Sequence, residues 1–120
     1  MYISPQLLEK VFVRGSLQNT ETGFEFKLKN IVDSGTIGSV KGFKLDSVEV
    51  PLESVSFRSA YGLRAATEIT YQNPLPLNYG TEATVMIAGT TLEPGEHQLV
   101  LTLSVIEAGK VELAFKSEIV

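Results

Sequence analysis

The feature that most constrains the fold of this chain is an alternation of apolar and polar residues with a period of two. It is clearest in residues 23–30, 96–106 and 111–116. In the first of these stretches, phenylalanine or leucine stands at every second position, and glutamate or lysine stands between them. Successive side chains of a β-strand point to opposite faces of a sheet. The pattern therefore predicts strands with one buried face and one solvated face, as in antiparallel sheets.

Further strands are predicted where β-branched and aromatic residues gather between turn signals rich in glycine, proline and asparagine. These weaker segments are residues 11–17, 42–50, 54–58, 65–71 and 83–88. About eight short strands at this spacing are typical of an all-β fold. We expect an antiparallel β-sandwich, immunoglobulin-like or jelly-roll-like, forming a single domain over residues 1–120.

Three local features complete the predicted architecture. Ser4-Pro5 resembles a helix N-cap followed by proline, so the chain begins with one helical turn or an extended arm. Ala108-Gly109 is suited to close a hairpin between the last two strands. Residues 72–80 form the longest irregular loop, and Gly35–Gly38 is a flexible loop without the context of a phosphate-binding motif.

Composition excludes several classes of function. The chain has no cysteine, which removes disulfides and thiolate chemistry and is compatible with a reducing compartment. Its formal charge of -4 offers no electrostatic footprint for nucleic acid or an anionic membrane. No signal peptide or membrane-spanning run is recognisable, so we expect a cytoplasmic protein.

No group of residues predicts a self-sufficient active site. His97 is the only histidine, and a lone histidine at the start of a strand is more often a partly exposed sheet residue than a catalyst. The acidic residues mostly alternate with apolar ones and therefore lie on solvated faces, which disfavours a two-carboxylate mechanism. We expect no catalytic, cofactor-binding or metal-binding residue in this chain.

The middle of the chain holds candidates for a partner surface. Tyr61, Arg64 and Tyr79 lie in or beside predicted loops, outside the alternating pattern. Tyrosine and arginine are enriched at interface hot spots because each combines apolar area with hydrogen bonding. We expect these three residues at a partner interface or at the edge of a pocket.

Two stretches carry a resemblance to a known family. The first is Gly23–Asn30, followed by Gly35 and by the Leu-Asp-Ser-Val-Glu-Val segment at 45–50; the second is Leu92–Leu101, with its Glu-Pro-Gly-Glu-His turn. In order and spacing they resemble the small β subunits of bacterial C-glycoside deglycosidases.

The resemblance implies a non-catalytic subunit of a heteromeric enzyme in carbohydrate metabolism. The partner would be a larger, TIM-barrel-like α subunit holding a divalent metal of the manganese or magnesium type. The complex would be a carbon–carbon lyase acting on 3-oxo-C-glycosides by β-elimination, with the metal stabilising the enolate. The alternative is a free-standing carbohydrate-binding or protein-interaction β-sandwich module, against which the absence of tryptophan counts.

Overall fold

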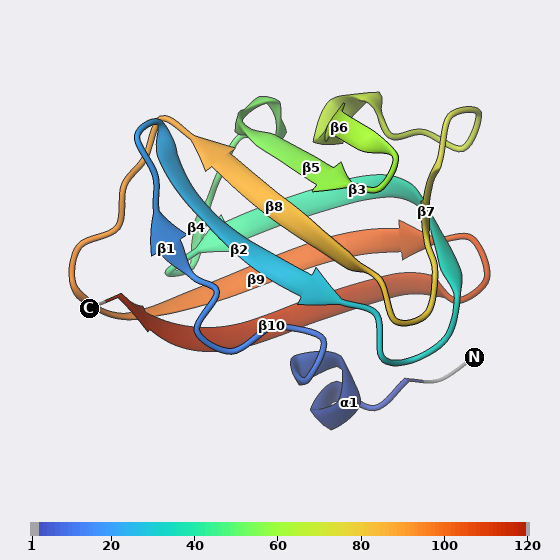
Figure 1. The fold of residues 1–120 in the computed structure, drawn as a ribbon, viewed down its shortest axis with the longest axis horizontal. Coiled ribbons are helices and arrows are strands. Elements are labelled where there is room, and N and C mark those ends of the chain that lie inside the picture. The colour runs from blue at the N-terminus through green and yellow to red at the C-terminus, as the bar shows by residue number, and fades with distance from the viewer. Residues whose placement is uncertain (1–2, 120) are drawn as a thin grey trace.

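The structure, a computed structural model, describes residues 3–119. Within that range the chain forms short helical turns and two antiparallel sheets (Figure 1). The elements are α1 (Pro5–Glu9), β1 (Gln18–Asn19), β2 (Gly23–Lys29), β3 (Gly35–Leu45), β4 (Val48–Glu49), the 3-10 turn η1 (Leu52–Ser54), β5 (Val55–Ser59), β6 (Gly62–Ala65), the 3-10 turn η2 (Ala66–Glu68), β7 (Leu75–Leu77), β8 (Glu82–Ala88), β9 (Gly95–Val105) and β10 (Gly109–Ile119).

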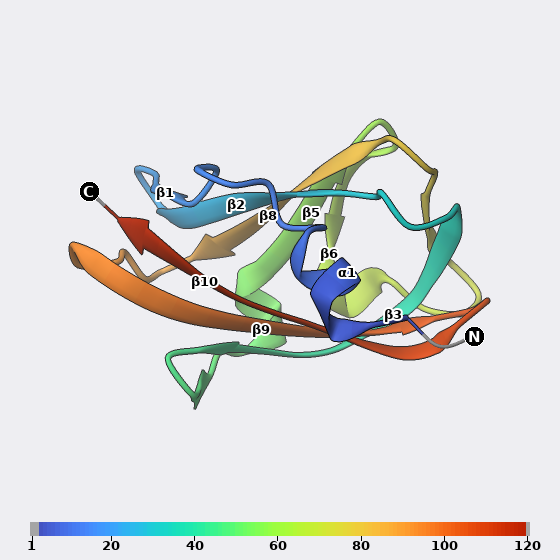
Figure 2. The same cartoon turned by 90° about the horizontal axis from the view of Figure 1, so that it is seen from below.

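The two sheets lie face to face, as Figure 2 shows from the side. The first sheet has the order β1-β2-β8-β5-β6, and the second has the order β10-β9-β3-β4, with β7 paired to the beginning of β3. The predicted antiparallel β-sandwich is confirmed. No helix within residues 3–119 is long and apolar enough to cross a membrane.

The core between the sheets comes from the alternating residues. Phe24 and Phe26 of β2 are at most 1% exposed, and their rings lie 6.4 Å and 5.9 Å from that of Phe43 on β3. Leu101 and Leu103 of β9 face the same interior, at 0% and 3% exposure. Because the aromatic and aliphatic side chains of both sheets form one cluster, burial of their apolar surface is the main force holding the layers together. That residues 1–120 form a single domain stays a prediction.

The start of the chain closes one open side of the sandwich. Ser4 caps α1, because its Oγ accepts a hydrogen bond from the Leu7 amide at 3.2 Å, so the helical alternative is correct. The predicted strand over residues 11–17 is wrong: Phe12 makes only an isolated bridge to Leu28. Its ring instead stacks on Phe115 with centroids 4.2 Å apart, so packing across the gap between the sheets decides the path of this segment.

Strand β3 is longer than the predicted strand and begins earlier, at Gly35. The predicted strand 42–50 is two strands, β3 and β4, joined by the two-residue turn Asp46-Ser47, in which both residues have positive φ (50° and 69°). This is the geometry of a type I′ hairpin turn. Gly35–Gly38, predicted as a loop, is the start of β3 and pairs with both β7 and β9. Sequence reasoning treated the glycines as breakers, whereas the pairing of residues 35–37 with β7 and of Ile37 with β9 holds this segment extended.

The segment between β6 and β8 also differs from expectation. The predicted strand 65–71 is the turn η2 with an isolated bridge between Thr70 and Asn73, and β7 lies inside the predicted loop 72–80. Tyr71 explains the difference, because its hydroxyl bonds to Ser104 and its ring lies over Gly38. This contact places the segment against the outer face of the second sheet, where it cannot continue the first.

Candidate functional site

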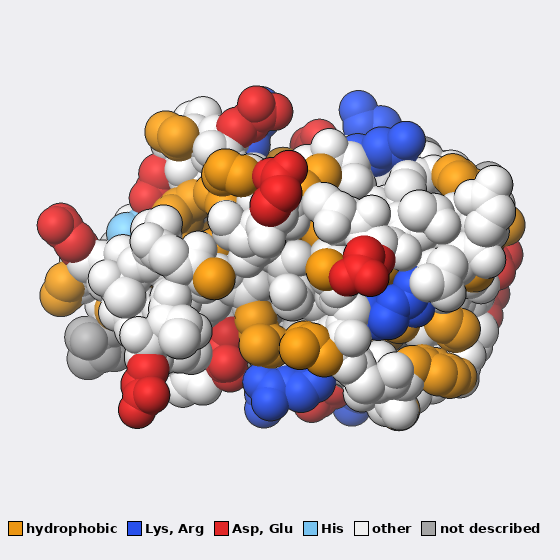
Figure 3. Space-filling model, turned by 90° about the horizontal axis from the view of Figure 1, so that it is seen from above, with side chains coloured by type: hydrophobic (Ala, Val, Ile, Leu, Met, Phe, Trp, Pro, Cys, Tyr) orange, Lys and Arg blue, Asp and Glu red, His pale blue; other side chains and the backbone are white. Residues whose placement is uncertain are grey.

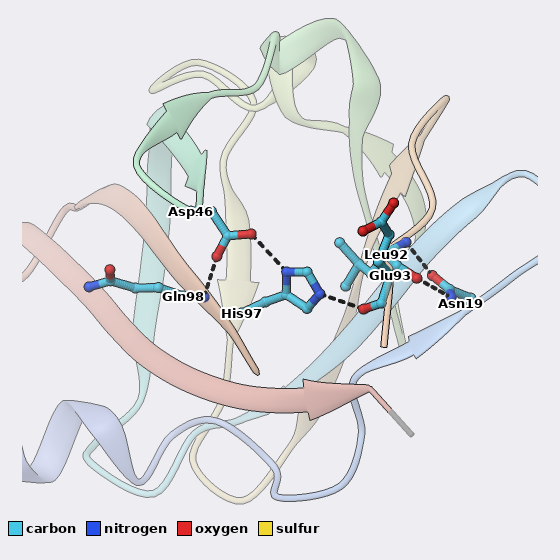
Figure 4. A network of polar contacts seen from close by, with 6 residues as sticks. All are labelled: Asn19, Asp46, Leu92, Glu93, His97 and Gln98. Atoms are coloured by element: carbon cyan, nitrogen blue, oxygen red, sulfur yellow. Dashed lines mark hydrogen bonds and ion pairs between the residues drawn. The ribbon is translucent and has the colours of Figure 1, made fainter. Parts of the chain in front are cut away.

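The single histidine joins three parts of the chain that are distant in sequence (Figure 4). His97 Nδ1 lies 2.7 Å from the Asp46 carboxylate in the β3–β4 turn, and Nε2 lies 2.7 Å from the Glu93 carbonyl oxygen in the β8–β9 loop. Asp46 also accepts a hydrogen bond from the Gln98 amide at 2.8 Å. The side chain of Asn19 extends the network, accepting from the Leu92 amide and donating to the Leu92 carbonyl.

The charges of this network follow from its partners. A carbonyl oxygen only accepts, so His97 Nε2 carries a proton, and the carboxylate favours a second proton on Nδ1. The pKa of His97 is raised, first by the bond to Glu93 and then by Asp46, against a smaller opposing effect of burial. The pKa of Asp46 is lowered, first by the Gln98 amide and then by His97. An imidazolium that donates twice has no free lone pair for a metal or a substrate proton.

Within residues 3–119, no group of three or more histidine, cysteine, aspartate or glutamate side chains could hold a metal ion. Whether the chain works without catalytic residues or a cofactor stays a prediction.

The structure places two of the three residues predicted at a partner surface on exposed turns that are linked through Asn78. Tyr61, in the β5–β6 turn, is 55% exposed, and Tyr79, in the β7–β8 turn, is 63% exposed. The two turns meet at Asn78, whose amide nitrogen lies 3.5 Å from the Tyr61 hydroxyl. Leu63, on β6, is 64% exposed and was missed, because a single leucine in the sequence does not reveal whether its side chain is buried or exposed. We call Tyr61, Leu63 and Tyr79 the tyrosine surface.

Arg64 has a different role from its two predicted companions. It pairs across the hairpin with buried Phe57, so both side chains lie on the same side of the sheet. Its guanidinium donates to the carbonyl oxygens of Asn73 (2.6 Å), Pro74 (3.3 Å) and Glu68 (3.4 Å). Arg64 therefore holds the loop between η2 and β7 in place. Figure 3 shows the face over β5 and β6, where hydrophobic side chains lie at the surface among charged ones.

A small apolar cavity lies between the sheets beside α1. Its volume is about 90 Å³, and its walls include Leu8, Ile37 and Leu103. At its rim, the Glu107 carboxylate accepts hydrogen bonds from the amide and hydroxyl of Thr36, both at 2.8 Å, and these bonds lower the pKa of Glu107. Ligand pockets are usually several hundred Å³ in volume. This cavity has room for only a few non-hydrogen atoms.

A comparison with known protein families identifies the family of this chain. Residues 7–120 match the family described as hydroxymethylglutaryl-CoA reductase, N-terminal domain. The chain belongs to this family. A search of curated proteins finds no match. The description makes this reductase domain one part of a larger protein.

Membership of the reductase family overturns the resemblance to C-glycoside deglycosidase β subunits. The assignments as a subunit of that enzyme, as a carbon–carbon lyase and as a protein of C-glycoside metabolism are wrong, because the family match covers nearly the whole chain. The motifs that carried the resemblance are an alternating strand, now β2, and a Pro-Gly turn leading into β9. Both are general features of antiparallel sandwiches, so they do not distinguish families.

A reductase acting on a CoA thioester needs a hydride donor, usually a nicotinamide dinucleotide, and neither the glycine-containing stretch nor the cavity beside α1 fits one. Gly35–Gly38, the glycine-containing stretch considered for phosphates, is extended as the start of β3: residues 35–37 pair with β7, and Ile37 also pairs with β9. Its amides therefore do not form the loop that cradles a pyrophosphate at a helix N-terminus. The cavity beside α1 is apolar and too small for a dinucleotide.

Proposed function

We propose that this chain is a non-catalytic interaction domain of a hydroxymethylglutaryl-CoA reductase, docking on the catalytic part of that protein through the tyrosine surface. The family match supports the reductase context. The observation that carries the docking role is the exposure of Tyr61, Leu63 and Tyr79, each more than half exposed on neighbouring turns of a rigid sandwich. The partner is the rest of the reductase, rather than the barrel-like α subunit that the overturned resemblance implied.

Tyrosine contributes a large apolar area with few rotatable bonds, so its immobilisation on binding costs little conformational entropy. Tyr61 lies on the turn between the paired strands β5 and β6, and Tyr79 lies on the connection from β7 to β8, where its amide donates to Ser34 Oγ at 3.0 Å. These contacts hold the backbone of both tyrosines in place before binding. An interface centred on such residues gains affinity from area that is already ordered. The divalent metal that the resemblance implied for the partner stays a prediction, and so does the cytoplasmic location expected from the sequence.

The test measures binding between this chain and the purified catalytic part of the reductase by calorimetry. The triple variant Tyr61→Ala, Leu63→Ala and Tyr79→Ala should bind about 30-fold to 1,000-fold more weakly, corresponding to roughly 2–4 kcal/mol. Arg64 is left intact, because its guanidinium holds the neighbouring loop. The matched control is Val48→Ala with Ile106→Ala, which shortens apolar side chains that are 67% and 49% exposed in β4 and in the β9–β10 turn.

Two results would contradict the proposal. One is equal binding by the triple variant and the wild type, with the fold intact by circular dichroism. The other is oxidation of a reduced nicotinamide by the isolated chain in the presence of hydroxymethylglutaryl-CoA, since a non-catalytic domain should show no turnover.

A further inference from the structure

The last strand forms an edge that is only partly covered. Within residues 3–119, β10 pairs with β9 alone. α1 lies along the first part of the outer edge, where a groove between helix and strand is lined by Gln6, Glu9, Lys110, Glu112 and Ala114. Figure 2 shows α1 crossing this half of β10 while the other half runs clear of the helix. Residues 115–119 therefore present an open edge.

An open edge offers unpaired amide and carbonyl groups to another strand. Along residues 115–119, Phe115 and Ile119 point into the core, at 5% and 9% exposure. Lys116 and Glu118 alternate with them and point to solvent on the outer face of the sheet. A groove beside this stretch, lined by Phe12, Arg14 and Phe115 among others, leaves room for a strand to approach.

We propose that residues 115–119 pair in antiparallel fashion with the same residues of a second copy of this chain, about a twofold axis at Ser117. In this register Lys116 of each copy faces Glu118 of the other, and Phe115 faces Ile119. Opposite charges meet on the outer face and apolar side chains meet on the inner face, and both kinds of cross-strand pair are favourable. The two sheets then form one continuous sheet across the axis.

The charges of Lys116 and Glu118 favour this register over registers shifted by two residues, and they make the strand complementary to its own copy. Shifting the pairing by two residues in one direction sets Lys116 opposite Lys116, and in the other direction sets Glu118 opposite Glu118. Like charges directly opposite each other destabilise a strand pair. The twofold arrangement is thus self-complementary, as an isologous dimer interface requires. The helix of each copy, beside residues 108–114, lies outside the paired stretch.

The experiment is sedimentation of the 120-residue chain over a series of concentrations. Because the paired stretch is short, we expect a reversible dimer with a dissociation constant on the order of micromolar. Lys116→Glu places two Glu–Glu contacts in the interface and should weaken the dimer about tenfold or more, and Glu118→Lys should do the same. The matched control is Lys110→Glu, a charge reversal on the same face of β10 under α1, which should leave the dissociation constant unchanged.

Two experiments that should restore dimerisation distinguish the proposed register from a general effect of charge on association. The double variant Lys116→Glu with Glu118→Lys restores opposite charges at every contact and should dimerise as the wild type does. A mixture of the two single variants should form heterodimers, because each then meets its complement. A wild-type chain that stays monomeric, or a dimer that none of these reversals changes, would overturn the proposal.

Discussion

Asn30 shows at the scale of one residue how the loops at the end of the sandwich are held. It is 7% exposed, and its amide nitrogen donates to the carbonyl oxygens of Asp33 (2.6 Å) and Leu77 (2.7 Å). Its side-chain oxygen accepts from the amides of Val32 (3.1 Å) and Asp33 (3.3 Å). One buried amide therefore satisfies backbone groups of the β2–β3 loop and of the end of β7. A smaller side chain would leave them all unpaired, and a carboxylate would leave the two carbonyl oxygens without a donor.

We predict that Asn30→Ala lowers the free energy of unfolding by about 2–3 kcal/mol, because buried carbonyl and amide groups lose their partners. Asn30→Asp should cost at least as much, since a carboxylate keeps the acceptors and loses both donors. Urea denaturation measures both values. Asn73→Ala is the control, because the side chain of Asn73 is exposed, and an equal effect of the control would contradict the role assigned to Asn30.

The pair of His97 and Asp46 predicts a dependence of stability on pH. The pKa of His97 is raised above 6.5 in the folded state, so its contribution is complete below that pH and is lost as pH rises through the folded pKa. The pKa of Asp46 is lowered below 3.8, so its contribution is present above that pH and is lost as pH falls through the folded pKa. The network should therefore stabilise the fold most between about pH 3.8 and 6.5.

The variant His97→Gln tests this dependence, since a neutral amide has no titrating proton. The difference in melting temperature between wild type and variant should be larger at about pH 5 than at about pH 9. Asp46→Asn should follow the same profile, because it removes the charge that holds the imidazolium. A difference that does not change with pH would show that the charge of His97 makes no contribution.

Sequence reasoning identified single residues better than it identified their partners. The buried positions Phe24, Phe26 and Leu101 follow from periodicity alone. The Asp46 partner of His97 does not, because a two-residue turn between β3 and β4 brings it to the start of β9. The same limit applies to Arg64, whose acceptors are backbone carbonyls that no side-chain pattern reveals.

At the scale of elements, the contact between β3 and the segment after η2 depends on a glycine. A Cβ atom added to Gly38 would lie 2.7 Å from Cε1 of Tyr71. The ring of Tyr71 would have to move, and its hydroxyl would lose the bond to Ser104. Gly42 on the same strand has nothing within 4 Å of such an atom, and φ is not positive at either residue.

We predict that Gly38→Ala lowers the free energy of unfolding by about 1–3 kcal/mol through this overlap. Gly42→Ala should be neutral or slightly stabilising, because alanine loses less backbone entropy than glycine on folding. Chemical denaturation of the two variants checks the comparison. Equal effects would mean that the packing of Tyr71 on Gly38 contributes nothing to stability.

The predicted segments differ in whether neighbouring residues or distant contacts determine their structure. Strands β2, β9 and β10 were predictable, because long alternation specifies both the strand and its buried face. The segments 11–17 and 65–71 were not, because each has a strand-like composition but follows a path set by Phe115 and Ser104 far along the chain. The tyrosine surface was predictable in part, because tyrosines in loops are typical of interfaces, whereas the exposure of Leu63 is known only from the structure.

At the scale of the whole molecule, a single apolar cluster joins both sheets and the segment before β1. We predict that urea unfolds the chain in one transition, with far-ultraviolet and near-ultraviolet circular dichroism changing together. The slope should be about 1–3 kcal/mol per molar urea, as for other small domains. Two separated transitions would mean that the sheets unfold independently and that the chain contains more than one domain.

The order of the strands also bears on the rate at which this structure forms. β2 pairs with β8 and β3 pairs with β9, so segments from opposite halves of the chain must meet before either sheet is complete. Only hairpins such as β5–β6 and β9–β10 can assemble from neighbouring residues. Long loops must close before most of the stabilising contacts can form. Chains whose strand pairing is mainly non-local therefore fold on the order of milliseconds to seconds. A newly made chain would therefore spend that interval with β2 and β8 unpaired and their apolar faces open to aggregation.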